Sequence, residues 1–235
     1  MTKESLEEML IKEFNIKDQL VLNNLYIYYE ELISFSKVMN LTTIKELKDV
    51  YIKHFYDSLL LSKTYDLTKN ITLADIGTGA GFPGLVLKIV YPNLDVTLIE
   101  PTTKRCVFLQ HVIDKLGLKK IKIVNERAEN LDESYRDSFD ITTARAVSAL
   151  NIIMELCIPF TKKGGYFIAL KGSSYEEEIE QTIHATKVLQ VKLHEKHLFD
   201  LPFDMGCRAI LLYKKEEITK KTYPRIYAKI KKNPL

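Results

Sequence analysis

The stretch Leu73-Ala-Asp-Ile-Gly-Thr-Gly-Ala-Gly-Phe-Pro-Gly84 decides the fold of this 235-residue chain. The apolar run Ile71 to Ile76 carries an acid, Asp75. Three glycines follow before a helix pattern begins at Pro83, and a fourth, Gly84, comes directly after that proline. Proline suits the first helical position because its missing N–H is not needed there. A glycine turn between strand and helix lets backbone N–H groups approach a ligand closely. The stretch therefore predicts a nucleotide-type cofactor loop at the C-terminal edge of a parallel sheet.

Two classes of cofactor fit this loop. Residues 79–84 match the dinucleotide fingerprint G-x-G-x-x-G, and Glu100, at the end of the next apolar run, is placed to bind ribose hydroxyls of either cofactor. S-adenosylmethionine is favoured because Gly77 opens a longer glycine turn ahead of the fingerprint. In addition, Asp75 can accept hydrogen bonds from turn amides or a ligand ammonium, whereas it suits a pyrophosphate poorly. A nicotinamide or flavin enzyme and a purely structural turn stay open as alternatives.

The composition fits one domain with an appendage, in a reducing compartment. With 46% hydrophobic residues the chain can bury a full core. Its three cysteines lack metal-ligand spacing, so no metal site is expected. The N-terminus does not resemble a signal peptide, and no apolar run reaches the length of a membrane span. We therefore expect a cytoplasmic monomer that binds no membrane.

Positive charge is concentrated near the C-terminus. The net charge is +3, but residues 214–232 hold eight basic and two acidic residues, a local charge of +6 that leaves the rest of the chain at −3. Tyr223 and Tyr227 are interleaved with the bases, which suits contact with a phosphate backbone and unstacked bases. An RNA-binding tail and an ordinary solvated tail are both consistent with this pattern.

Helix and strand patterns alternate along most of the chain. Residues 1–65 have the apolar spacing of helices. Beyond them we expect strands near 71–76, 95–100, 121–125, 139–143, 166–170, 191–199 and 207–213, and helices near 83–91, 103–116, 149–158 and 175–189. Such alternation predicts an α/β fold with a doubly wound, mostly parallel, seven-stranded sheet. The last two strands are joined without a helix, which predicts a hairpin and an antiparallel edge strand.

Further motifs accompany the glycine loop in one fixed order. They are Asn40-Leu-Thr42, His54-Phe-Tyr-Asp57-Ser-Leu59, Thr103-Lys-Arg105, Glu126-Arg-Ala-Glu129, Thr143-Ala-Arg-Ala-Val147, Lys171-Gly172 and Tyr223-Pro-Arg225. In this combination nearly the whole chain resembles the glucose-inhibited division protein B family, bacterial methyltransferases of guanine N7 in 16S ribosomal RNA. The resemblance implies a class I (Rossmann-like) methyltransferase fold, S-adenosylmethionine as cofactor, and 16S ribosomal RNA or the small ribosomal subunit as partner.

Three parts of the chain are expected from these patterns. They are an N-terminal helical appendage at 1–65, a methyltransferase domain at 66–215 and a basic tail at 216–235. The chain departs from the family pattern at Glu100-Pro101, where an acid followed by serine is usual. The tail segment 224–230 also lacks the family's usual glycine and second proline.

The loop argument and the resemblance together predict the cofactor site. Its residues are Asp75, Gly77, Gly79, Phe82, Glu100, Ala128, Glu129 and Arg145. The resemblance places Glu129 and the backbone of Ala128 after the third strand, where loops of a doubly wound sheet can read an adenine edge. Arg145 ends the fourth strand, where it can clamp the methionine carboxylate or the RNA. A structural ion pair is the competing interpretation of Arg145.

The expected chemistry needs positioning more than acid–base catalysis. Guanine N7 carries a lone pair and no proton, and positioning alone can contribute about 7–11 kcal/mol. We therefore assign no catalytic residue, although Arg145 is a candidate, and we expect RNA contacts at Lys171, Arg225 and Lys229. His54 and Asp57 share a helix face and could reach the cleft or simply pack between helices.

Three other functions stay compatible with the sequence. They are a small-molecule methyltransferase, an NAD-dependent oxidoreductase and a non-catalytic RNA-binding module. In a small-molecule methyltransferase the basic tail would be dispensable. The oxidoreductase differs in its cofactor, and the binding module would transfer no methyl group.

Overall fold

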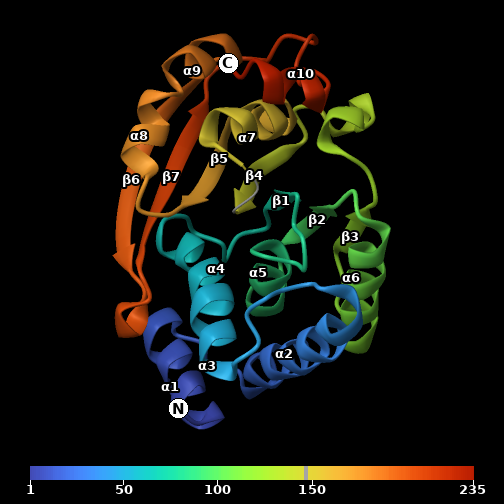
Figure 1. The fold of residues 1–235 in the computed structure, drawn as a ribbon, viewed down its shortest axis with the longest axis vertical. Coiled ribbons are helices and arrows are strands. Elements are labelled where there is room, and N and C mark those ends of the chain that lie inside the picture. The colour runs from blue at the N-terminus through green and yellow to red at the C-terminus, as the bar shows by residue number, and fades with distance from the viewer. Residues whose placement is uncertain (146–147) are drawn as a thin grey trace.

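The computed structural model describes residues 1–145 and 148–235, so the last two residues of the Thr143–Val147 motif lie outside the described residues. The described residues form one seven-stranded sheet of order β3-β2-β1-β4-β5-β7-β6 (Figure 1). The strands are β1 (Thr72–Ile76), β2 (Asp95–Ile99), β3 (Ile121–Val124), β4 (Phe139–Arg145), β5 (Thr161–Lys171), β6 (Val191–Asp200) and β7 (Cys207–Lys215). β1 pairs in parallel with both β2 and β4. The strand order therefore reverses beside β1, where ligands bind in open α/β sheets.

Helices cover both faces of this sheet. Between the strands lie α5 (Gly84–Val90), α6 (Thr103–Lys115), α7 (Leu150–Cys157), α8 (Tyr175–Glu180) and α9 (Ile183–Leu189), and the chain ends with α10 (Tyr227–Lys232). Neighbouring side chains of a strand point to opposite faces of the sheet, so each strand contributes to the apolar contacts with both helix layers. In β1, Leu73 joins the apolar cluster with α5 and α6, while Ala74 joins the cluster with α7 and α9.

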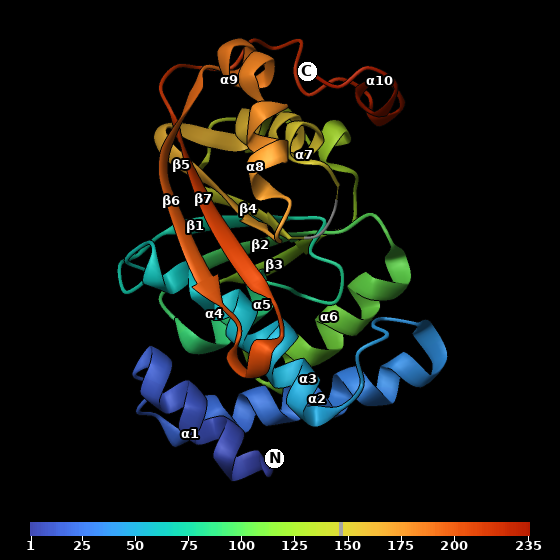
Figure 2. The same ribbon diagram turned by 60° about the vertical axis from the view of Figure 1, so that its left-hand side comes forward.

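The N-terminal helices share the core of the sheet domain. They are α1 (Lys3–Phe14), α2 (Gln19–Met39), α3 (Leu47–Val50) and α4 (Asp57–Leu59), with a π-helical turn at Tyr51–Tyr56. On α2 the apolar residues Leu25, Tyr28 and Leu32 are fully buried in the same cluster as α5 and α6. Figures 1 and 2 show α2 crossing one end of α6, at the end of the molecule opposite the C-terminus. No described helix is both long and apolar enough to cross a membrane.

The expected strands and hairpin are confirmed, with three corrections. The antiparallel strand β7 lies inside the sheet, between β5 and β6, so the edge strand β6 runs parallel to β5. The helix expected at 175–189 is two helices, because the hydroxyl and amide of Thr182 both donate to the Ile179 carbonyl and interrupt the helical ladder. Pro83 precedes α5 as its N-cap residue and is not its first helical residue.

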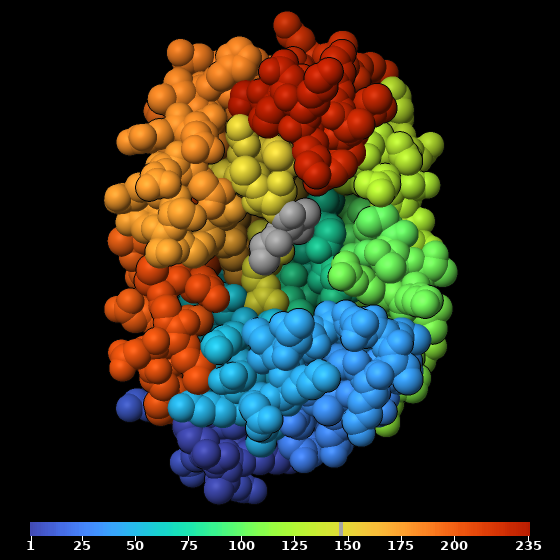
Figure 3. All heavy atoms as spheres, viewed as in Figure 1, coloured from blue at the N-terminus to red at the C-terminus, as the bar shows by residue number. Residues whose placement is uncertain are grey.

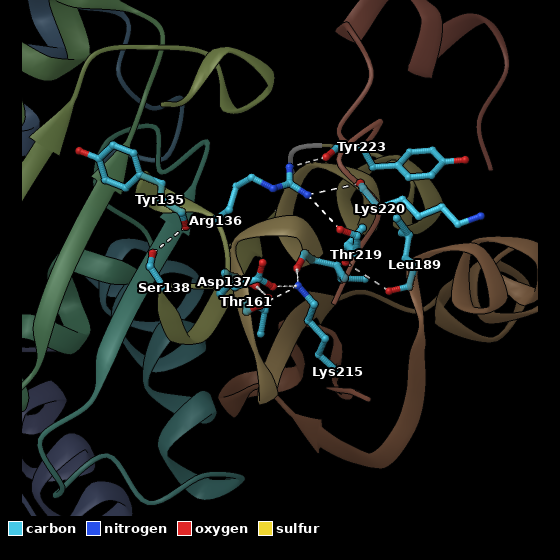
Figure 4. A network of polar contacts seen from close by, with 12 residues as sticks. Tyr135, Arg136, Asp137, Ser138, Thr161, Leu189, Lys215, Thr219, Lys220 and Tyr223 are labelled. Carbon is cyan, nitrogen blue, oxygen red and sulfur yellow. Dashed lines mark hydrogen bonds and ion pairs between the residues drawn. The ribbon is translucent and has the colours of Figure 1, made fainter. Parts of the chain in front are cut away.

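The basic tail follows the surface of the sheet domain. The Arg136 guanidinium donates to the carbonyls of Thr219 (3.1 Å), Lys220 (3.3 Å) and Tyr223 (2.6 Å), as Figure 4 shows. Ile230 on α10 is fully buried in the cluster of α7. The tail backbone is therefore held by buried and polar contacts, despite its high charge.

Candidate cofactor and substrate site

The glycine turn follows β1 directly and is tied to the neighbouring strand. The amides of Gly77 and Thr78 both donate to the Ile99 carbonyl, at 2.8 and 3.2 Å. Gly79 has a φ of +62°, and no described atom would meet a Cβ there within 4 Å, so backbone conformation explains the glycine. At Gly84 the reason is space, since a Cβ would lie 2.6 Å from the Leu98 side chain and 2.8 Å from Cβ of Asp75.

Asp75 joins the end of β1 to the start of α5. The carboxylate is completely buried, and its Oδ2 accepts from the Thr78 hydroxyl (2.5 Å) and the Gly84 amide (2.8 Å). Burial raises the pKa of Asp75 to about 6, although both hydrogen bonds act to lower it. Asp75 therefore accepts from a turn amide, as expected. A direct contact with the cofactor stays a prediction, because Asp75 is not among the described residues that line the cavity above the turn.

Glu100 anchors the turn from the neighbouring strand. It follows β2, is 1% exposed, and accepts from the amides of Gly79 (3.0 Å) and Thr102 (2.8 Å). The Arg105 guanidinium lies 3.6 Å from its Oε2. Each carboxylate oxygen has more than one acceptor site, so Glu100 keeps capacity for ligand hydroxyls.

A cavity of about 410 Å³ lies against this turn. Gly77, Gly79, Phe82, Glu100 and Arg145 are the predicted residues that line it. The opposite wall comes from the N-terminal part of the chain, through Leu41, Thr42 and His54. Figure 3 shows that the molecular surface is hollowed between the N-terminal helices and the C-terminal tail.

The structure favours one of the two alternatives left open for His54, because this side chain reaches the cavity. His54 stacks on Phe82 with ring centroids 4.3 Å apart, and its Nε2 lies 3.1 Å from the Thr42 hydroxyl. Burial and the nearby Arg145 charge lower the pKa of His54 to about 3. The imidazole is therefore neutral at physiological pH. The sequence signal for this wall was the presence of Asn40-Leu-Thr42 and of the His54 motif among the motifs that resemble the family.

Arg145 is fixed by an ion pair. Its guanidinium donates to Asp57 Oδ2 and to the Lys53 carbonyl, both at 2.8 Å, and to His54 Nδ1 at 3.1 Å. The other Asp57 oxygen accepts from Arg208 Nε at 2.8 Å, although Arg208 carried no sequence signal. The structure thus contains the competing ion pair. The Arg145 side chain also borders the cavity, so a contact with cofactor or RNA stays a prediction.

Ala128 and Glu129 lie in a short 3-10 turn after β3. Ala128 is buried and Glu129 is half-buried. Neither is among the described residues that line the cavity. The structure therefore does not bring these two residues, predicted to contact an adenine, together with the rest of the site. Their role stays a prediction.

Two of the three candidate RNA contacts are engaged in ion pairs. Lys171 is buried, with Nζ 2.6 Å from Glu178 and 3.1 Å from the Ser148 carbonyl. The Arg225 guanidinium donates from Nε and Nη2 to the buried Glu155 carboxylate, at 2.8 and 2.6 Å. Lys229, on α10, is exposed. Among the described residues, no group of three His, Cys, Asp or Glu side chains could hold a metal ion.

Sequence comparison identifies the relatives of this chain. The family described as GidB, rRNA small subunit methyltransferase G, matches residues 21–202. The chain is 43% identical to ribosomal RNA small subunit methyltransferase G of Staphylococcus aureus, over 100% of this chain and 99% of that protein. The protein of the same name from Acholeplasma laidlawii is 49% identical over 88% of this chain and 90% of its own length.

Solved structures agree on the fold. A SAM-dependent methyltransferase from Aquifex aeolicus has a TM-score of 0.55 and 19% identity, over 76% of this chain and 97% of that one. A variant of the 16S rRNA (adenine(1408)-N(1))-methyltransferase from Catenulisporales acidiphilia, with cosubstrate SAM, has a TM-score of 0.51 and 13% identity, over 69% and 90%. At such identities the likeness concerns the fold alone. The sequence relatives go further: this chain belongs to the rRNA small subunit methyltransferase G family, as its motif order predicts.

Proposed function

We propose that this chain transfers a methyl group from S-adenosylmethionine to N7 of a guanine in 16S ribosomal RNA, in the cytoplasm. The observation that carries the proposal is the cavity at the reversal of strand order, with the glycine turn on one side and the Glu100 carboxylate beside it. Family membership supports a methyltransferase of small-subunit ribosomal RNA. The proposal adds to that membership the atom that is methylated, N7 of guanine.

The residues present fit the cofactor. The cavity volume of about 410 Å³ falls in the range of small-molecule sites, about 300–1,000 Å³. Glu100 would hold the ribose hydroxyls, and the backbone at Gly77 and Gly79 would lie against the ligand without a Cβ between them. Phe82 and His54 supply an aromatic wall. When bound, S-adenosylmethionine supplies a methyl group on a positively charged sulfur.

The protein groups around the cavity suit methylation of a nitrogen lone pair. Guanine N7 carries no proton, so no side chain has to remove one. His54 also lines the cavity, yet its pKa of about 3 leaves it a poor proton acceptor. The arrangement therefore contributes mainly by orienting the reactants and excluding water.

The tail favours an RNA substrate over a small molecule. Lys229, Lys231 and Lys232 are exposed on α10, and the buried Ile230 of the same helix packs against the sheet domain. An ordered helix that presents several cations suits a phosphate backbone. A small-molecule substrate would not need this surface.

A labelling experiment tests the proposed function. Purified protein is incubated with methyl-tritiated S-adenosylmethionine and either naked 16S RNA or small ribosomal subunits that lack the modification. The RNA is then digested to nucleosides, and we expect the label in 7-methylguanosine. Label in another nucleoside, or none with either substrate, contradicts the proposal. Comparison of the two substrates shows whether the enzyme acts before or after subunit assembly.

A further inference from the structure

A second cavity adjoins the cofactor cavity. Its volume is about 370 Å³, and it shares His54 and Arg145 with the first, so these two side chains stand between the two spaces. The rest of its lining includes five charged side chains: Lys53, Asp57, Lys171, Glu178 and Arg208. A cavity of this size, beside a cofactor cavity and lined by polar groups, is suited to a small planar ligand.

Most of these charges neutralise one another. Asp57 uses one oxygen for Arg145 and the other for Arg208. Lys171 lies 2.6 Å from Glu178 Oε2, and that same oxygen accepts the Leu150 amide at 2.8 Å. Glu178 Oε2 is therefore committed to the protein, and it fixes the carboxylate in one orientation.

The other oxygen of Glu178 is available to a ligand. Among the described residues, the one hydrogen-bond partner of Oε1 is the Ser174 hydroxyl at 3.4 Å, which is long for an O–H···O bond. The Glu178 side chain is 17% exposed, so a ligand that enters the cavity can reach it. The cavity thus contains a fixed carboxylate oxygen that can still accept hydrogen bonds.

We propose that this second cavity receives the target guanine and that Glu178 Oε1 recognises its Watson–Crick edge. The inference rests on the proposed function of the neighbouring cavity. Guanine presents two adjacent donors on this edge, N1–H and the 2-amino group, and both suit a carboxylate acceptor. Enzymes that modify a base commonly take it out of its stack and read this edge.

The proposed orientation also suits the reaction. N7 lies on the opposite side of the purine from the N1 and 2-amino positions. A guanine held by Glu178 therefore directs N7 away from α8, toward the wall of His54 and Arg145 that borders the cofactor cavity. Adenine has an acceptor at N1 and no 2-amino group, so it would leave the carboxylate facing a lone pair. The lining also has four cationic side chains against two carboxylates, which suits a nucleotide attached to phosphates.

Glu178→Gln is a sharp test because only one end of the new amide can replace Oε2. The Leu150 amide donates to that position and the Lys171 ammonium lies 2.6 Å from it, so the amide oxygen stays there and the NH2 group replaces Oε1. The substitution thus converts an acceptor into a donor with little change in shape. Glu177→Gln is the matched control, since Glu177 is exposed on the same helix and is not among the described residues that line the cavity.

The first measurement is nucleotide binding by calorimetry, with S-adenosylhomocysteine present to fill the cofactor cavity. We expect wild type and Glu177→Gln to bind guanosine monophosphate roughly tenfold more tightly than inosine monophosphate, which lacks the 2-amino group, and than adenosine monophosphate. Glu178→Gln should lose the preference over inosine monophosphate and gain affinity for adenosine monophosphate. A merely structural role of Glu178 would not reverse base preference. Equal binding of the three nucleotides by wild type, or an unchanged preference in Glu178→Gln, overturns the inference.

A second measurement tests the inference when the mononucleotides bind too weakly for their affinities to be compared. Methyl transfer to small-subunit RNA by Glu178→Gln should show a kcat/KM at least about tenfold below wild type, with S-adenosylmethionine affinity unchanged. The assay is run well below the Tm of the variant, because loss of the charge beside buried Lys171 lowers stability. A value within threefold of wild type overturns the inference. The proposed function fails separately, if wild type forms no 7-methylguanosine. If wild type forms it and Glu178→Gln behaves like wild type, only the guanine recognition is wrong.

Discussion

The glycine turn at residues 77–82 and the basic tail at 216–235 use charge in different ways. At the turn, buried carboxylates accept backbone and hydroxyl donors, and the groups that they hold surround a cavity. In the tail, Arg225 is bound to buried Glu155, while Lys229 is exposed on the outer surface. Charge therefore shapes a cavity in the first region, whereas in the second it fastens a surface helix. A charged residue in either region can be structural even where its sequence motif indicates a ligand.

Loss of the tail's buried ion pair should have the largest effect on stability. Arg225→Ala leaves Glu155, which is fully buried, without its guanidinium partner. We expect the free energy of unfolding to fall by about 3–5 kcal/mol, the usual cost of breaking a buried pair. Urea unfolding measures this, with Lys229→Ala as the control at an exposed position of the same tail. A fall of less than about 1 kcal/mol, the scale of a surface pair, would mean that Arg225 does not fasten the tail.

Loss of Glu100 should have the largest effect on cofactor binding. Glu100→Ala removes the carboxylate from the cavity and leaves the amides of Gly79 and Thr102 without their acceptor. We expect at least about 100-fold weaker S-adenosylmethionine binding, because two charge-assisted hydrogen bonds to the ligand disappear. Calorimetry on the folded variant gives the value, and Glu126→Ala, at an exposed acid after β3, is the control. Affinity within tenfold of wild type contradicts the assignment.

The buried acid of the turn should leave a pH signature. The pKa of Asp75 is raised to about 6, above its value in the unfolded chain, so the folded state holds an extra proton between about pH 4 and 6. The contribution of Asp75 to stability therefore falls as pH rises through this interval and then stays constant. The difference in unfolding free energy between wild type and Asp75→Asn should decrease over the same interval. A constant difference means that Asp75 titrates normally.

A smaller effect should come from a helix that supports the turn. The Tyr28 hydroxyl donates to the Ala80 carbonyl, and the ring stacks on Phe82 and Phe55 with centroids 5.5 Å apart. Tyr28→Phe keeps the stacking but leaves a buried carbonyl without its donor. We expect about 1 kcal/mol weaker cofactor binding, roughly a fivefold change. Tyr26→Phe, on the same helix, is the control, and unchanged affinity in Tyr28→Phe would show that α2 does not position the turn.

The strand pattern and glycine motif predicted the sheet and the turn because both depend on local sequence. Alternating β and α segments leave few topologies, and glycines at fixed spacing identify the loop. Partners distant in sequence were not predictable in this way. Arg145 pairs with Asp57, 88 residues earlier, and nothing near either residue indicates the other. The motifs located the wall at Thr42 and His54, but only the fold shows which cavity they face.

The tail illustrates the same limit. Its charge pattern predicted a cationic surface, yet each base looks alike in the sequence. Arg225 has a buried acid within reach, whereas Lys229 is exposed, and that difference follows from where α7 and α10 lie. Contacts between elements, rather than composition, therefore determine which basic residues hold the tail in place and which remain candidates for RNA contact.

The smallest effect should come from the exposed lysines of the tail. Lys229 and Lys232 lie three residues apart on α10 and therefore share a face. Each phosphate that they neutralise releases counterions, so the double substitution to Gln should make RNA binding less sensitive to salt. The slope of log K against log salt concentration should flatten by about 0.7 for each phosphate of single-stranded RNA that is no longer neutralised. Filter binding across a salt series measures the slope, while Tm and cofactor affinity should stay at wild-type values. The double substitution of Lys12 and Lys17 to Gln is the matched control, because both lysines are exposed and Lys12 belongs to α1, which lies at the end of the molecule opposite α10 (Figure 1). A slope for the tail variant equal to that of wild type would mean that Lys229 and Lys232 are only solvated, and a flatter slope in the Lys12 and Lys17 variant instead would place the RNA over the N-terminal helices.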